Sequence, residues 1–190
     1  VEGLGLDSVG VELDDKNAIR VDEHSKTNVD HIYAVGDVTN RVQLTPVAIR
    51  EGQAFADTVF GDKPTTVDYS CIPSAVFSHP PIGAVGMTEK QVLDAGIRCD
   101  CRVLPLEYVP RALVNRDTRG LVKIVAEAGT GRIMGVHALS DGAGDLITAA
   151  TYAMTAGLTV DRLAHTWAPY LTMAEALKLT AQTFTTDVTK

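Results

Sequence analysis

The chain has 190 residues, a formal net charge of −7 and three cysteines. Hydrophobic residues make up 45% and charged residues 22%, which is ordinary for a globular protein with a buried core. The negative charge argues against a nucleic-acid partner, and no apolar run is long enough to span a bilayer. An odd number of cysteines does not suggest a secreted disulphide framework, so we expect a cytoplasmic protein.

The first 37 residues predict a hairpin and then a buried strand. Residues 9–13 and 18–22 alternate apolar and polar side chains around turn-forming residues, which predicts a hairpin or sheet edge. Residues 32–35 form a β-branched and aromatic run that stops at Gly36-Asp37. Glycine lets a ligand approach the backbone, and open α/β sheets bind ligands at the carboxyl ends of their strands. Gly36 and Asp37 are therefore candidate ligand-binding residues.

A helix follows this strand. Leu44, Thr45, Pro46 and Ala48 mark its start, with Thr45 expected as the N-cap and Pro46 as the first helical residue. The helix is expected to end before Gly61. Its free N–H groups and positive dipole end favour a negatively charged ligand. The order of strand, acidic residue and helix start predicts a nucleotide site, although the spacing does not say which nucleotide.

The residues after the turn-rich segment 61–66 predict a second domain. We place the boundary so that the domains are 1–66 and 67–190. Thr88 is expected to cap a helix with Gln91 as its capping-box partner, and Thr159 to cap another. The remaining pattern predicts an antiparallel sheet with helices, having strands at 74–77, 82–87, 98–106, 121–126 and 132–139 and helices at 88–96 and 142–156.

The cysteines and histidines give weaker signals. Cys99 and Cys101 are two apart in a predicted strand, so their thiols share a face and could approach a soft metal. Without further ligands at the usual spacing they are not a recognisable zinc site, and we favour a structural role. Cys71 is expected to serve packing. His79, in a Pro-rich turn, and His165 are interpreted as structural or surface residues.

Residues 27–37 and 44–48 resemble the second flavin-binding segment of the FAD-dependent pyridine nucleotide-disulphide oxidoreductases. The resemblance implies that the Asp37 side chain bonds the ribityl chain of FAD, and that the helix start points at the flavin pyrimidine ring. It makes Gly36, Leu44, Thr45, Pro46 and Ala48 the other expected FAD-binding residues. It also implies an α/β chain, with the end of a Rossmann-like FAD domain followed by the family's dimerisation domain.

Residues 169–175 resemble the segment of the same family that carries a catalytic His and, five residues later, a Glu. Here Tyr170 stands in place of the His, while Thr172 and Glu175 match. A phenol with an ordinary pKa of about 10 is a poor base at neutral pH, so reduction of a disulphide should suffer. Reduction of a thiolate-bound metal ion has no thiol leaving group to protonate. Glu175 has an alternative role, because Thr172 and Glu175 also have the spacing of a capping box.

Two branches of the family are resembled. Tyr170, residues 109–120 and residues 182–188, which match what precedes a terminal cysteine pair, resemble the mercuric reductases. Residues 40–48 and 78–86 resemble the glutathione reductases, so a disulphide-reducing enzyme or a chimaera stays open.

The mercuric reductase resemblance implies a homodimer that uses FAD and NADPH to reduce Hg(II) bound to thiolates. Its NADPH site and redox cysteines would lie outside this chain. We therefore interpret the chain, which begins with Val1, as the C-terminal part of a longer polypeptide, inactive by itself. A third possibility is a dimerisation module without activity of its own.

Overall fold

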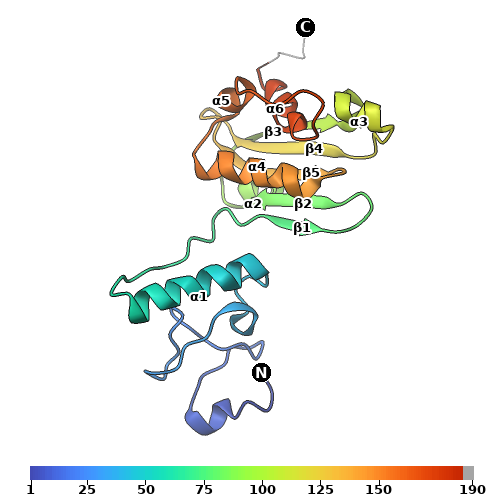
Figure 1. The fold of residues 1–190 in the computed structure, drawn as a ribbon. Coiled ribbons are helices and arrows are strands. Elements are labelled where there is room, and N and C mark those ends of the chain that lie inside the picture. Colours follow the sequence, from blue (N-terminus) through green and yellow to red (C-terminus); the bar gives the residue numbers. More distant parts are fainter. Residues whose placement is uncertain (186–190) are drawn as a thin grey trace. The chain divides into compact units, whose positions relative to one another are not determined.

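A computed structural model describes residues 1–185, which form two compact units (Figure 1). The first unit is Val1–Tyr69, and the second begins at Ser70. Residues 186–188, at the end of the segment that resembles the mercuric reductases, lie outside the described residues. Among residues 1–185, the structure has no helix that is both long and apolar enough to cross a membrane.

The first unit holds one α-helix and two 3₁₀ turns, Leu6–Val9 and Gly36–Thr39. The predicted hairpin is reduced to a bridge between Leu13 and Ile19. The predicted strand at 32–35 is also limited to a bridge, between Lys26 and Tyr33. A strand needs neighbours that take up its backbone groups along its length, and here only the short segment 25–27 does so.

Helix α1, Thr45–Phe60, confirms the helix predicted after this strand, including its end at Gly61. Its start differs by one residue from the prediction. Leu44 is the N-cap, Thr45 is the first helical residue and Pro46 lies within the first turn. No side chain caps the helix, so Thr45 does not have the capping role that was expected.

The second unit is built on a five-stranded sheet in which all neighbouring strands are antiparallel, in the order β1-β2-β5-β4-β3. All five strands were predicted, with shifts of at most one residue at each end. The strands are β1 Ser74–Val76, β2 Ile82–Gly86, β3 Cys99–Pro105, β4 Leu121–Glu127 and β5 Ile133–Leu139.

Within the described residues, five α-helices and a 3₁₀ turn, Leu106–Tyr108, accompany the sheet. The α-helices are α2 Glu89–Asp94, α3 Pro110–Asn115, α4 Ala143–Thr155, α5 Val160–Ala164 and α6 Glu175–Gln182. The capping box of Thr88 and Gln91 is present at the start of α2, and Thr159 caps α5 as expected. Helix α3 was not predicted as a helix.

One face of the sheet carries the apolar core. Helix α4 packs on β2 and β5, and α6 packs on β3 and β4 (Figure 1). Gly83 of β2 allows the close approach of α4, because a Cβ there would meet Ile147 Cγ1 at 2.5 Å. The fully buried side chains of this layer include Val122, Ile124, Val136, Leu146 and Ile147. Burial of such side chains on one face positions the loops and helix ends of the second unit.

Candidate functional site

The Gly36-Asp37 turn lies against the first turn of α1. Gly36 has a φ of +75°, which glycine adopts without strain, and a Cβ there would lie 3.0 Å from Ala48 Cβ. The Thr39 hydroxyl donates to the Gly36 carbonyl at 2.8 Å. The Asp37 side chain is exposed at this junction. The turn thus presents a carboxylate to solvent beside a helix N-terminus.

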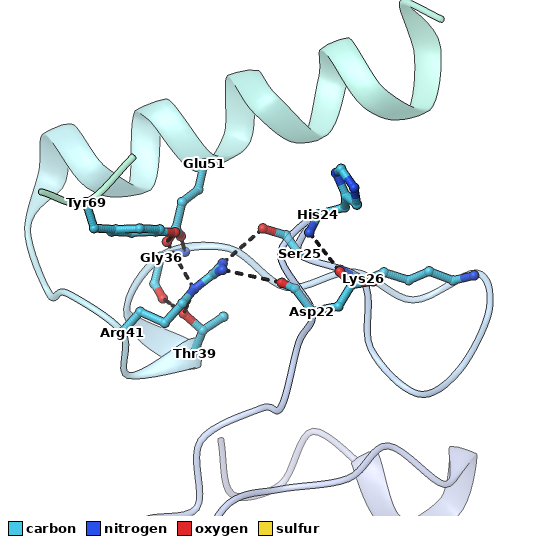
Figure 2. A network of polar contacts seen from close by, with 9 residues as sticks. All are labelled: Asp22, His24, Ser25, Lys26, Gly36, Thr39, Arg41, Glu51 and Tyr69. Carbon is cyan, nitrogen blue, oxygen red and sulfur yellow. Dashed lines mark hydrogen bonds and ion pairs between the residues drawn. The ribbon is translucent and has the colours of Figure 1, made fainter. Parts of the chain in front are cut away.

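A buried carboxylate holds this turn by a hydrogen bond to its backbone. Glu51, on α1, is 1% exposed. Its Oε2 accepts the Gly36 N–H at 2.6 Å, and its Oε1 accepts the Tyr69 hydroxyl at 2.6 Å (Figure 2). Arg41 Nε lies 3.2 Å from the same Oε1. A buried charge is tolerated when it is paired and hydrogen-bonded, and Glu51 meets both conditions.

Arg41 extends the network to an earlier loop. Its guanidinium donates to Ser25 Oγ at 2.9 Å and lies over the Tyr69 ring, 5.7 Å from the centroid. Asp22 Oδ1 holds that loop by accepting the N–H groups of His24 at 2.8 Å and Lys26 at 2.9 Å. Figure 2 shows Arg41 between the Asp22–Ser25 loop and the Glu51–Tyr69 pair.

Tyr69 acts as a donor in this network. Burial first, and then its hydrogen bond to Glu51, raise the pKa of the Tyr69 phenol to about 12. The phenol therefore keeps its proton at neutral pH and supplies the hydrogen bond that the Glu51 carboxylate accepts.

The predicted FAD-binding residues lie together at the junction of this turn and α1. Gly36 faces Ala48, and Leu44, Thr45 and Pro46 begin the helix that Ala48 continues. The sequence interpretation missed Glu51, Arg41 and Tyr69. A signal was available, because Val47, Glu51 and Ala54 are the buried positions of α1 and have the spacing of one helix face. A charged residue at a core position requires partners.

Tyr170 and Glu175 lie in the second unit. The Tyr170 side chain is 73% exposed, and the next residue, Leu171, has a φ of +61°. The expected capping box is half present. The Thr172 hydroxyl accepts the Glu175 N–H at 3.3 Å, but Ala174 is the N-cap of α6, and Glu175 Oε2 is buried without a hydrogen-bond partner among the described residues.

An apolar groove of about 380 Å³ is lined in part by residues that directly precede Tyr170 in the sequence. Its lining includes Tyr152, Leu158, Trp167, Pro169 and Leu177. Trp167 is 98% exposed and Tyr152 71% exposed. Exposed aromatic side chains around an apolar groove are typical of a surface that binds another protein.

The other candidate residues lie in packed or surface positions. Cys71 packs against the core of the second unit, and His165 Nδ1 contacts the Asp161 carbonyl at 2.7 Å on the surface. His79 is exposed in its turn. Within residues 1–185, no three His, Cys, Asp or Glu side chains are grouped to hold a metal ion.

Replacing Glu51 by Ala should lower the free energy of unfolding by about 3 kcal/mol or more, because Arg41 and the Gly36 N–H would lose a buried partner. Urea unfolding followed by circular dichroism measures the change. Glu12→Ala, at an exposed position, is the matched control and should stay within about 0.5 kcal/mol of the wild type. Equal stability of the two variants would contradict the role of Glu51.

The Tyr69 hydrogen bond should make stability depend on alkaline pH. Since the folded pKa is raised, the stabilisation is complete below the unfolded pKa of about 10 and is lost as the pH rises towards 12. At pH 8, Tyr69→Phe should be about 1 kcal/mol less stable than the wild type. Urea midpoints at a series of pH values should show this difference shrinking above pH 10, and a constant difference would refute the assignment.

Comparisons with known proteins place these features in a family. Residues 2–52 match the family model described as pyridine nucleotide-disulphide oxidoreductase, and residues 72–181 match that family's dimerisation domain. The mercuric reductase of Streptomyces lividans is 55% identical over 188 residues, which are 99% of this chain and 40% of that protein. The mercuric reductase of Staphylococcus aureus is 44% identical over 189 residues, or 100% of this chain and 35% of that protein.

Solved structures agree in fold. The HOCl-induced flavoprotein disulfide reductase RclA from Escherichia coli has a TM-score of 0.88 at 29% identity, covering 98% of this chain and 42% of that one. LpdA from Mycobacterium tuberculosis has a TM-score of 0.86 at 30% identity, covering 96% and 40%. The chain thus spans about 40% of the length of its relatives. The chain belongs to the pyridine nucleotide-disulphide oxidoreductase family.

Proposed function

We propose that this chain is the C-terminal part of an FAD- and NADPH-dependent reductase that converts thiolate-bound Hg(II) to Hg(0). Residues 1–66 would complete an FAD-binding domain, and residues 67–190 would form the dimerisation domain. The observation that carries the proposal is the Gly36-Asp37 turn, locked by buried Glu51 against the start of α1. The 55% identity to a mercuric reductase supports the choice of substrate.

The residues at this turn fit a flavin nucleotide. The family is named after its pyridine nucleotide, and the similar RclA protein is a flavoprotein, which supports flavin and pyridine nucleotide cofactors. Ala48 leaves no room for a side chain at position 36, so the turn requires glycine there. Asp37 is exposed and can accept hydrogen bonds from ribityl hydroxyls. Helix α1 has no side-chain cap, so its first turn can offer N–H groups and a positive dipole end to the flavin ring.

FAD, when bound, would accept hydride equivalents from NADPH and pass electrons onward. Asp37 would hold the ribityl chain, and Leu44, Thr45 and Ala48 would bring the helix end to the pyrimidine side. The positive helix end would favour an anionic reduced flavin by roughly 1 kcal/mol. Glu51 acts indirectly, because it fixes the Gly36 N–H and therefore the direction of Asp37.

The tyrosine at position 170 favours the hypothesis that the substrate is a metal ion rather than a disulphide. Disulphide reduction needs an acid for the leaving thiolate, and a residue that titrates near neutral pH serves best. Tyr170 is exposed and can donate a hydrogen bond to a thiolate or its bound ion. Soft thiolate ligands suit a soft ion such as Hg(II). Glu175 would orient the Tyr170 segment through its N–H bond to Thr172.

The groove beside residues 167–170 supports a homodimer. The match to a dimerisation domain covers this region, and Trp167 and Tyr152 present large apolar area to solvent. A second copy of the chain would remove that area from water. The three free cysteines agree with a reducing compartment, and we propose the cytoplasm.

Replacing Asp37 by Ala in the full-length enzyme should weaken FAD binding by about 10- to 100-fold, the loss expected for hydrogen bonds to a charged group. FAD per subunit is measured by absorbance after gel filtration. Asp15→Ala, which removes an exposed carboxylate of the same unit, should keep the wild-type FAD content. Retention of FAD by the Asp37 variant would argue against this site.

The full-length enzyme should oxidise NADPH rapidly with Hg(II) plus thiol and only slowly with glutathione disulphide. Tyr170→Phe should slow the Hg(II) reaction about tenfold or more, because the hydroxyl donor is lost. Tyr108→Phe, at a tyrosine of the second unit that is 64% exposed and does not line the groove, is the control for surface effects. Rapid turnover of the disulphide by the wild type would instead favour the glutathione reductase branch.

A further inference from the structure

A pair of thiols lies on the sheet face opposite the main core. Cys99 and Cys101 are both half-buried on β3, and their Sγ atoms are 3.9 Å apart. Lys123 of β4 and Glu89 of α2 form an ion pair at 2.5 Å, close enough to act on the Cys101 thiol electrostatically. Two strands and a helix therefore converge on the pair.

This geometry does not suit a disulphide. A strand rises by about 3.3 Å per residue, so the two Cα atoms are about 6.6 Å apart, at the upper end of the range for disulphides. Both Cβ atoms point the same way from the strand, so they stay far from the separation of about 3.8 Å that a disulphide needs. Closing the bond would require the backbone of β3 to move, although the strand is paired with β4 along its whole length.

The same separation suits a bridging metal ion. Metal–sulfur bonds of about 2.3 Å that meet at a tetrahedral angle place two sulfurs about 3.8 Å apart. A linear unit with the same bonds needs about 4.6 Å, about 0.7 Å more than the pair has. A bent unit forms with the pair as it stands, and it leaves positions on the ion open to free thiols.

The surrounding charges also suit a divalent ion. Two thiolates carry a charge of −2, which a divalent ion cancels, and the adjacent Glu89–Lys123 pair is already neutral. Soft sulfur ligands select soft ions over Mg²⁺ or Ca²⁺. We propose that Cys99 and Cys101 form a two-thiol binding site for Hg(II), separate from the reducing centre of the proposed function.

The ion would enter by ligand exchange without a change of oxidation state. Hg(II) carried by two small thiolates forms two bonds to the Cys99 and Cys101 sulfurs, and its two original bonds break. The protons of the two cysteines leave with the two released thiols. The exchange therefore balances in atoms, protons and electrons.

Equilibrium dialysis of the 190-residue chain against HgCl₂ in excess mercaptoethanol tests the site. The chain has three cysteines, so three single variants separate them. Wild type and Cys71→Ser should retain one Hg(II) per chain. Cys99→Ser and Cys101→Ser should each bind about tenfold or more weakly, because a single thiol loses the advantage of a second sulfur at high effective concentration. Affinities within twofold of the wild type, or an equal loss in Cys71→Ser, would overturn the proposal.

Three further measurements keep the result interpretable. Circular dichroism melting should show that the serine variants are folded, and ultraviolet absorbance should show a sulfur-to-mercury band in the wild type that both Cys99→Ser and Cys101→Ser lose. Gel filtration should show no growth in size with Hg(II), since cross-linking of two chains would refute a chelate within one chain. Binding is measured without FAD or NADPH, so its failure leaves the proposed reductase activity standing, and failure of that activity leaves this site standing.

Discussion

The candidate flavin site depends on one buried carboxylate. Glu51 binds the Gly36 N–H with one oxygen and Tyr69 and Arg41 with the other, in a place with 1% exposure. A charge at such depth is costly unless all its partners are present, so the contacts form together or not at all. The network therefore gives the first unit a fixed turn geometry although that unit has little regular sheet of its own.

In the second unit, the two faces of the sheet differ in the groups that they carry. One face is apolar and is covered by α4 and α6, which fixes the strand register and the ends of the helices. The opposite face, here called the polar face, carries the Glu89–Lys123 ion pair and the two thiols of β3 beside the buried Val125. Alternation of side chains along a strand produces this division, since residues two apart in sequence share a face. A binding site on the polar face can thus change without disturbing the core.

In the proposed reaction, the side chain at position 170 sets the chemistry, whereas the segment around it supplies a fixed backbone. The surrounding segment keeps Thr172 in contact with the Glu175 N–H, so the local backbone is held as a unit. The residue presented from it is a phenol, which donates a hydrogen bond but accepts a proton poorly at neutral pH. The chemical demand of the substrate, rather than the fold, then decides which reaction is supported.

The local features of the chain could be predicted from neighbouring residues. The capping box at Thr88 and Gln91, the five strands of the second unit and the end of α1 at Gly61 depend on neighbouring residues, and all were predicted. The Gly36-Asp37 turn and the helix after it were also visible, because glycine, aspartate and proline have strong positional meaning.

Contacts between distant residues could not be predicted in this way, because they depend on the folded chain. Glu51 accepts hydrogen bonds from Gly36 and Tyr69, which are 15 and 18 positions away in the sequence. Helix periodicity indicates that Glu51 is buried, but it does not identify either partner. The strand predicted at 32–35 stays a single bridge because its pairing depends on neighbours rather than on its own β-branched residues. The capping box at Thr172 is incomplete because α6 begins at Glu175 itself. Caps and turns depend on adjacent residues, whereas burial and strand pairing depend on which surfaces the folded chain brings together.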